Sequence, residues 1–160
     1  MTSTPQFAEN VPTGISERLL TVRSWDDCAR WSRLANVVIS GGGTVNGDGD
    51  QWSEQCTPTC PDRTDTTQRP TLLGLFWVDG LTISDLRFVH SAFWTIHPAF
   101  SNNIRVVGNH IVQTKPGTDG LDPDSCWNVY IENNTFSTRD DCIALKSGKD
   151  WSGRVSGKCD

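Results

Sequence analysis

Four short segments of the chain resemble one another, and this internal repeat is the feature that most constrains the fold. Each segment begins with Asn or Gly and continues with apolar residues at alternate positions; the segments start at Asn36, Gly80, Asn103 and Asn128. The starts are separated by 44, 23 and 25 positions. These intervals fit one period of about 22 to 25 residues if the first interval holds two turns of the repeat. The 160 residues are therefore expected to form one domain built from similar units.

The residues inside each repeat indicate strands rather than helices. Apolar side chains alternate in short runs, as Leu81 and Ile83 do in one repeat and Val129 and Ile131 do in another, and this alternation is typical of strands. Gly, Asn, Asp and Pro gather between the runs, which leaves no helical pattern for the crossover of a βαβ sheet. The pattern is best satisfied by a parallel β-helix, in which each rung buries its inward side chains against its neighbours.

A β-sandwich of hairpins is the alternative all-β fold. It would need turns every 8 to 12 residues with two-residue hairpin signals, and Asn46-Gly47 is the only Asn-Gly dipeptide in the chain. We therefore expect residues 35–160 to form the rungs of a β-helix. Residues 1–34 do not share the repeat and are expected to form a separate N-terminal segment.

Two further local structures are expected outside the repeats. Ser24 followed by Asp27 resembles a helix N-cap with its acidic partner, which predicts a short helix from Trp25 to Trp31. Such a helix would cover the open end of the array and keep its strand edge from pairing with other chains. The stretch 53–70 is rich in Thr, Pro and Asp and is expected to be a surface loop.

Charge and composition exclude several classes of function. The chain carries 14 basic and 19 acidic side chains, a net charge of -5, which opposes binding to the backbone of a nucleic acid. No apolar run is long enough to cross a membrane, and the first ten residues lack the apolar stretch of a signal peptide. The six cysteines suit three disulfides and an oxidising compartment. Cys56 and Cys60 have no second closely spaced Cys or His pair after them, so no metal and no cofactor is expected.

The spacing of the late acidic residues indicates where chemistry takes place. Asp119 precedes Asp140 by 21 residues and Asp141 by 22, about one rung, and neighbouring rungs of a β-helix lie about 4.8 Å apart. The three carboxyl groups are therefore expected to share one patch, where one of them tends to keep a proton while another acts as a base. A paired acid and base of this kind cleaves glycosidic bonds.

The late acids differ in whether a structural or a functional role is expected for them. Asp122 and Asp124 flank Pro123, and both are interpreted as turn formers. Asp140 and Asp141 directly precede the apolar run Cys142-Ile143-Ala144-Leu145. Two charges at the edge of a buried strand would be desolvated at a cost in free energy, and this favours a functional role for the pair.

Several short motifs follow one another in a specific order. They are Gly41-Gly-Gly-Thr-Val-Asn-Gly47 with Trp52, Arg69-Pro70, Phe93-Trp-Thr-Ile-His-Pro98, Thr118-Asp-Gly-Leu-Asp-Pro-Asp-Ser125 and Asp140-Asp-Cys-Ile-Ala-Leu-Lys-Ser-Gly148. In this order they resemble the polygalacturonase family, glycoside hydrolase family 28, over the first part of its catalytic domain. The resemblance implies a right-handed parallel β-helix that hydrolyses α-1,4-galacturonosyl bonds of pectin, with inversion and without a metal.

The resemblance also implies roles for individual residues. Asp140 matches the proton donor, while Asp119 and Asp141 match the pair that positions and deprotonates the attacking water. Lys146 is the only basic residue in the late motif. A cation at that position could bind a carboxylate of the substrate, and a solvated lysine is the alternative reading.

The chain also departs from the family pattern. Gly117, Arg139 and Ser53 stand where that family commonly has Asn, a small residue and a second Trp. The Gly-His-Gly and Arg-Ile-Lys motifs of the family are missing. From these departures we expect a truncated β-helix with weak or no activity. The alternative is a catalytically dead fragment or a module that binds acidic polysaccharide.

The expected partners and location follow from the same resemblance. The partners are polygalacturonan and pectin oligosaccharides, with no nucleic acid and no membrane, and the location is extracellular. A full-length form is expected to be a monomer, whereas the open last rung of this chain favours self-association. A disulfide between Cys142 and Cys159 is the preferred pairing.

Overall fold

A computed structural model of the chain describes residues 34–50 and 69–148. The described residues form ten strands and no long helix. They are β1 (Leu34–Ser40), β2 (Thr44–Asn46), β3 (Leu73–Phe76), β4 (Val78–Ser84), β5 (Arg87–Val89), β6 (Ile96–Ala99), β7 (Asn102–Val107), β8 (His110–Val112), β9 (Trp127–Glu132) and β10 (Thr135–Ser137).

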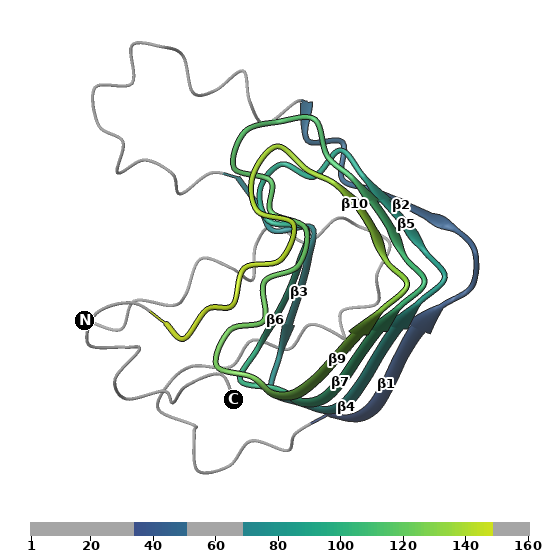
Figure 1. The fold of residues 1–160 in the computed structure, drawn as a ribbon, viewed down its shortest axis with the longest axis vertical. Coiled ribbons are helices and arrows are strands. Elements are labelled where there is room, and N and C mark those ends of the chain that lie inside the picture. Colours follow the sequence, from purple (N-terminus) through teal and green to yellow (C-terminus); the bar gives the residue numbers. More distant parts are fainter. Residues whose placement is uncertain (1–33, 51–68, 149–160) are drawn as a thin grey trace.

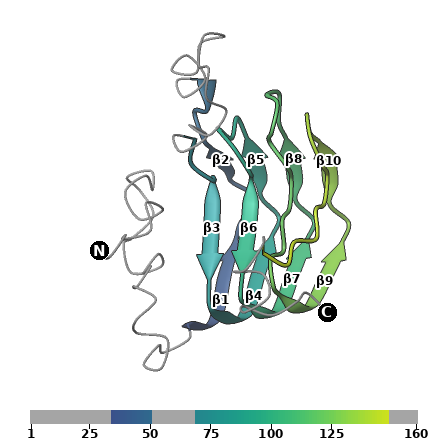
Figure 2. The ribbon, with the colours of Figure 1, turned by 90° about the vertical axis from the view of Figure 1, so that its left-hand side faces the viewer.

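The strands stack into three parallel sheets, which form the sides of a coil viewed along its axis in Figure 1. One sheet has the order β1-β4-β7-β9 and a second has the order β2-β5-β8-β10. The third sheet pairs β3 with β6 and continues through parallel bridges to residues 121–124 and then 143–146. Figure 2 shows this third sheet face on, with successive rungs side by side. The fold is a parallel β-helix, as the repeat predicted.

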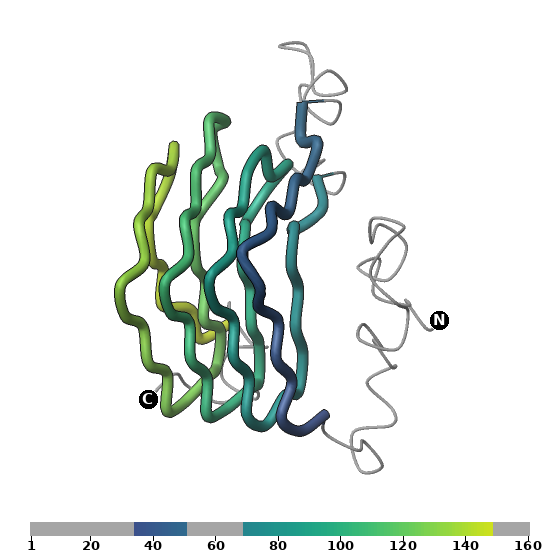
Figure 3. The backbone as a smooth tube through the Cα atoms, turned by 90° about the vertical axis from the view of Figure 1, so that its right-hand side faces the viewer, coloured from purple at the N-terminus to yellow at the C-terminus, as the bar shows by residue number. Residues whose placement is uncertain are grey.

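The prediction that the first repeat interval holds two turns of the coil is wrong. β1 pairs directly with β4, with Val37 opposite Leu81, so the 44 positions between Asn36 and Gly80 span one turn of the coil and not two. The additional residues fall between β2 and β3, a stretch that includes residues 51–68, which lie outside the described residues. The predicted loop over 53–70 lies mostly outside the described residues, and the predicted helix over 25–31 lies wholly outside them. Figure 3 shows the backbone of the described rungs side by side.

The Asn or Gly that begins each repeat has a backbone reason to be there. Asn36, Gly80, Asn103 and Asn128 all have positive φ, between 54° and 81°, and they occupy equivalent positions in β1, β4, β7 and β9. Gly adopts this left-handed conformation without steric cost, and Asn adopts it more readily than most residues. The Asn side chains also bond along the stack, since Asn103 Nδ2 donates to Asp79 Oδ1 at 2.8 Å. The repeat therefore marks the place where each rung bends.

A second amide stack lies inside the coil, after the strands of the β1-β4-β7-β9 sheet. The Asn109 side chain is fully buried, accepts a hydrogen bond from the Leu86 N–H at 3.1 Å and donates to the Ile83 carbonyl at 3.0 Å. Asn134 repeats the arrangement one rung later by accepting from the Asn109 N–H at 2.9 Å. These side chains satisfy backbone groups that the turn would otherwise leave buried without partners.

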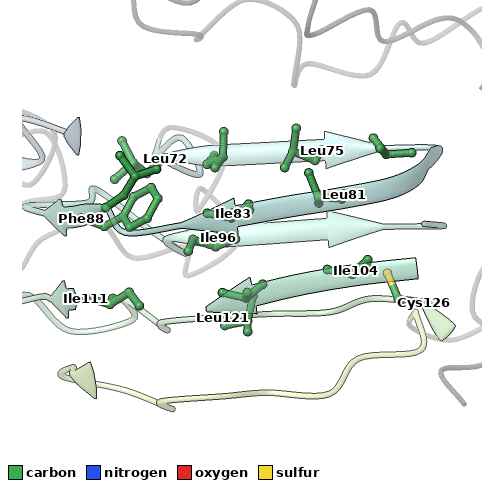
Figure 4. Close-up of a cluster of buried hydrophobic side chains, with 14 residues drawn as sticks. Leu72, Leu75, Leu81, Ile83, Phe88, Ile96, Ile104, Ile111, Leu121 and Cys126 are labelled. Atoms are coloured by element: carbon green, nitrogen blue, oxygen red, sulfur yellow. The ribbon is translucent and has the colours of Figure 1, made fainter. Parts of the chain in front are cut away.

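The core is a set of apolar columns that run along the coil axis. In-register pairing aligns Leu81 with Ile104 and Val129 in one column, and aligns Phe88 with Ile111 and Phe136 in another. Figure 4 shows Leu81 and Ile104 of the first column and Phe88 and Ile111 of the second among the buried side chains. The core side chains of the central rungs are fully buried, whereas Val129 and Phe136 on the last complete rung are only partly buried. Burial of such columns is the main source of stability in a solenoid.

Candidate active site

The candidate site is built on the third sheet, where residues 121–124 and 143–146 stack on β6. The Gly120 N–H donates to the Asp141 carbonyl at 2.9 Å, and the Leu121 N–H donates to the Cys142 carbonyl at 3.1 Å. These bonds place the chain around Asp119 directly beside the chain around Asp141, on neighbouring rungs. The structure therefore brings together the two segments whose one-rung spacing predicted a shared acidic patch.

Asp140 and Asp141 lie in an exposed turn that precedes the last described rung. The Asp141 N–H donates to Asp140 Oδ1 at 3.0 Å, and the Thr138 hydroxyl donates to the Asp140 carbonyl at 2.8 Å. Both acids are exposed, and Ile143 and Leu145 of the run that follows are 42% and 74% exposed. The argument from desolvation is therefore wrong, because this run is the outermost rung of the described residues. The positions of these acids remain compatible with contact to a solvent-borne substrate.

Asp119, in contrast, is buried and engaged by a cation. Its side chain is 7% exposed, and its Oδ2 accepts a hydrogen bond from Lys146 Nζ at 3.2 Å. Lys146 lies on the neighbouring rung, as the bridge between Lys146 and Asp124 shows. Its ammonium also lies 4.2 Å from the centre of the Trp94 ring, within the range of a cation–π interaction. Lys146 is thus not simply a solvated lysine, and its charge is directed at the acids of the site.

Asp122 is the unexpected member of the site. Its side chain is completely buried, and Oδ1 lies 3.0 Å from Lys146 Nζ. Burial raises the pKa of Asp122 to about 8, the neighbouring Asp119 adds to the increase, and Lys146 opposes it. The interpretation of Asp122 as a surface turn former is wrong. The apolar residue before it, Leu121, continues the core column of β6, and the strand that buries Leu121 carries Asp122 with it.

The charge of Lys146 is strengthened by the same two acids. Burial on its own lowers the pKa of Lys146, but the contacts with Asp122 and then Asp119 raise it by more, so the net shift is upward. Lys146 therefore remains an ammonium throughout the neutral pH range. A group with two carboxyl contacts and an aromatic contact has few N–H directions left for a substrate.

Asp124 lies two positions after Asp122 and makes a separate cluster with His97. His97 Nε2 lies 3.7 Å from Asp124 Oδ2, and the Gly148 N–H donates to Asp124 Oδ1 at 2.9 Å. The His97 contact lowers the pKa of Asp124 by more than burial raises it. The His97 ring packs edge-on against Trp94, with 4.9 Å between ring centres. The interpretation of Asp124 as a turn former is also wrong, since its backbone bridges both Ala99 and Lys146.

A local packing reason explains Gly117, a departure from the family pattern. Gly117 has a φ of +73°, and a Cβ there would lie 3.0 Å from Arg69 Nη2. Arg69 Nη1 donates to the Pro116 carbonyl at 2.9 Å, and its guanidinium lies 5.1 Å from the Phe93 ring centre. Arg69 thereby holds the loop that leads into Asp119, and Gly117 adopts the positive φ of this loop without steric cost.

Residues that sequence reasoning missed share one detectable signal. Asp122 and His97 lie on strand segments whose registers are fixed by the bridge from Ile96 to Leu121, so the one-rung spacing that located Asp119 could also have located both of them.

Within residues 34–50 and 69–148, no group of three or more His, Cys, Asp or Glu side chains is placed to hold a metal ion. The same residues contain no helix that is long and apolar enough to cross a membrane. Cys142 is an exposed free cysteine, so the expected Cys142–Cys159 disulfide is not present in this structure.

The sequence matches known proteins over most of its length. The family described as "Glycosyl hydrolases family 28" matches residues 19–157. A "Probable polygalacturonase" of Vitis vinifera is 36% identical over 129 residues, which cover 79% of this chain and 26% of that protein. A "Polygalacturonase" of Cryptomeria japonica is 30% identical over 157 residues, which cover 90% of this chain and 29% of that protein. The chain spans less than a third of the length of these curated relatives.

Two solved structures share the fold. An exopolygalacturonase from Thermotoga maritima superposes with a TM-score of 0.67 at 24% identity, over 76% of this chain and 35% of that one. A family 28 exopolygalacturonase from Yersinia enterocolitica superposes with a TM-score of 0.69 at 18% identity, over 81% of this chain and 30% of that one. At these identities the likeness concerns the fold alone, and it agrees with the stacked parallel sheets.

Proposed function

The chain belongs to glycosyl hydrolases family 28, and from this premise we propose that its protein hydrolyses α-1,4-galacturonosyl bonds of pectin. The observation that carries the proposal is the backbone hydrogen bond of 2.9 Å from Gly120 to Asp141. This bond sets Asp119 and Asp141, which are 22 positions apart in the chain, on neighbouring rungs. A pair of carboxyl groups on one face is what glycoside hydrolysis requires.

The proposed reaction assigns a step to each acid. Asp140 donates its proton to the glycosidic oxygen while the bond from that oxygen to the anomeric carbon breaks. Asp119 and Asp141 hold a water molecule and remove its proton as its oxygen bonds to the anomeric carbon from the opposite face. The configuration at that carbon is inverted, which calls for roughly 6.5–9.5 Å between acid and base. Exposure of Asp140 supports its access to a polymer, and the Lys146 contact at 3.2 Å supports a fixed position for the Asp119 side chain.

The location and partners of the protein are part of the same proposal. Pectin is an extracellular polymer, so the protein acts outside the cell as a secreted, monomeric enzyme of cell-wall degradation. The even number of cysteines supports an oxidising compartment. The net charge of -5 disfavours nucleic acid as a partner, and it also repels the anionic substrate, so turnover by the 160-residue chain is expected to be slow.

The test is the release of reducing ends from polygalacturonate by the purified chain. We expect slow release by the unchanged chain and a loss of at least 100-fold with Asp140→Asn, because the amide cannot supply the proton. Glu132→Gln is the matched control, since Glu132 is an exposed acid on β9 that contacts Tyr130 and not the site. Equal rates for the unchanged chain and Asp140→Asn would overturn the proposal.

Product stereochemistry provides a second measurement on the same samples. Proton NMR at early times should show the inverted anomer before mutarotation equilibrates the two forms. Retention of configuration would contradict the assigned roles of Asp119 and Asp141, because it requires a covalent intermediate on one carboxylate.

A further inference from the structure

The inner side of the candidate site holds a carboxyl group that the proposed reaction does not use. We propose that Asp122 is a positioning residue, which stays uncharged and, through Lys146, keeps the Asp119 side chain in place. The proposal rests on the proposed function only for its catalytic consequence. The arrangement of Asp122, Lys146 and Asp119 stands on geometry and can be tested without turnover.

The first step concerns the surroundings of Asp122. Its side chain is 0% exposed, and its N–H donates to the Ile96 carbonyl at 2.8 Å, which fixes the backbone in the sheet. Apart from the Lys146 ammonium 3.0 Å from Oδ1, neither carboxyl oxygen has a partner at hydrogen-bonding geometry among the described residues. Burial penalises an anion in this place, and the single ammonium offsets only part of that penalty. The Asp122 carboxyl group is therefore protonated and uncharged at neutral pH, in agreement with its pKa of about 8.

The second step concerns the distribution of the ammonium charge. Lys146 Nζ lies between Asp122 Oδ1 at 3.0 Å and Asp119 Oδ2 at 3.2 Å, and the Trp94 ring covers it at 4.2 Å. If both acids were ionised, two negative charges would share one positive charge in a buried place. With Asp122 neutral, the ammonium charge pairs with Asp119 alone, and Asp122 supplies only a dipole that fixes the nitrogen.

The third step considers the other ionisable groups around Asp122. His97 lies on β6, at the register position beside Asp122 that follows from the bridge between Ile96 and Leu121. The nearest acid to its Nε2 is Asp124, at 3.7 Å. Asp141, on the outer rung, is exposed and faces solvent. Lys146 is therefore the cation in contact with Asp122 among the described residues. Loss of the proton from Asp122 would directly change the interaction between Lys146 and Asp119.

The proposal has a catalytic consequence for a base in the site. When Asp122 loses its proton above about pH 8, the Lys146 ammonium is shared between two anions. Asp119 is then less firmly held, and the geometry that a water-activating base needs is weakened. Asp122 thus sets the upper end of the pH range in which the site keeps its arrangement.

The first experiment measures the pH dependence of unfolding of the 160-residue chain between pH 4 and pH 9. A buried acid with a raised pKa makes the folded state lose stability as pH rises from about 4 to about 8, because folding then requires uptake of a proton. The unfolding constant should rise by up to tenfold per pH unit in this window, and Asp122→Asn should remove that rise. Asp124→Asn is the matched control, since it leaves the rise in place. An equal pH dependence for the unchanged chain and Asp122→Asn would overturn the proposal.

The second experiment follows the Lys146 side chain by NMR, using the resonance of its Cε carbon. A proton lost from Asp122 should shift this resonance near pH 8, well below the titration of Lys146 itself. Asp122→Asn should abolish the inflection, and Lys146→Arg identifies the signal. A purely packing role for Asp122 would produce no inflection in the unchanged chain, and that result would also overturn the proposal.

Turnover then separates this proposal from the proposed function. Asp122→Ala should lower kcat at least tenfold with little change in KM, and Asp122→Asn should restore most of the lost kcat, because the amide keeps an oxygen toward Lys146. Loss through KM with an unchanged kcat would count against a positioning role. If no variant and no unchanged chain releases reducing ends, the proposed function fails, while the unfolding and NMR results still decide the role of Asp122.

Discussion

The β1-β4-β7-β9 sheet and the third sheet belong to the same coil, but they solve different problems. The first has four continuous strands in register, with Asn or Gly at the bend of each rung. The third has two regular strands, and its last two rungs are held by isolated bridges at 121–124 and 143–146. The regular sheet buries apolar columns, whereas the third sheet buries Asp119 and Asp122 beside Lys146. The difference indicates that regularity in this fold stabilises the coil, and that the candidate site lies where regular pairing is interrupted.

The largest expected effect is in the apolar columns of the regular sheet. Ile104 is fully buried in β7, and Ile104→Ala should lower the free energy of unfolding by about 2–5 kcal/mol through lost burial and a cavity. Urea denaturation measures the change. Arg105→Ala on the outward side of the same strand is the control and should cost about 1 kcal/mol or less. A smaller loss for Ile104→Ala than for Arg105→Ala would contradict the assignment of the inward face.

The next effect concerns the buried amide stack. Asn109→Ala removes the acceptor of the Leu86 N–H and the donor to the Ile83 carbonyl. We expect a loss of about 2–3 kcal/mol, because buried backbone groups are left without partners. Thermal unfolding is a suitable measurement, with Glu132→Ala on the exposed surface as the control near zero. Equal stability of the two variants would show that water replaces the amide.

A smaller effect is expected at the bends that carry the sequence repeat. Asn103 has a φ of 55°, and Asn103→Val should cost about 1–2 kcal/mol because a β-branched residue is strained in this region. Asn103→Gly is the matched variant that loses the same bond to Asp79 without the strain. The comparison of the two in urea isolates the backbone contribution, and indistinguishable midpoints would exclude it.

The smallest effect is the electrostatic contribution of Asp124 in the third sheet. The folded-state pKa of Asp124 lies below its usual value of 3.8, so its contribution is present above about pH 4 and is lost as pH falls through the folded pKa. Because the Asp124 side chain is still 17% exposed and its His97 partner is 3.7 Å away, Asp124→Asn should cost only about 1 kcal/mol or less at pH 7. Unfolding in urea at pH 7 and at pH 3 checks the sign, since the two proteins should converge at the lower pH. A constant difference at both pH values would assign the effect to packing.

The comparison also explains which predictions from sequence succeeded. The Asn and Gly spacing predicted the rungs, because a bend with positive φ restricts the residue type wherever it recurs. The same spacing placed Asp119 beside Asp141, since one period corresponds to one rung. It misjudged the first interval, because the residues between β2 and β3 add length without adding a rung. The interpretation of Asp122 and Asp124 as turn formers was wrong for a different reason. Two acids on either side of Pro123 resemble a turn when only the local sequence is considered, and the neighbouring rungs decide otherwise.

The sequence by itself determined the period, the strand type, the family motifs and the columns of apolar residues, since each of these depends on residues close together or one period apart. Only the tertiary structure decided which acids are buried, because burial depends on the rungs stacked on either side. It likewise decided that Lys146 lies between Asp119 and Asp122 under Trp94. That contact joins residues from three rungs, and the energy of a charge depends on all of its neighbours at once.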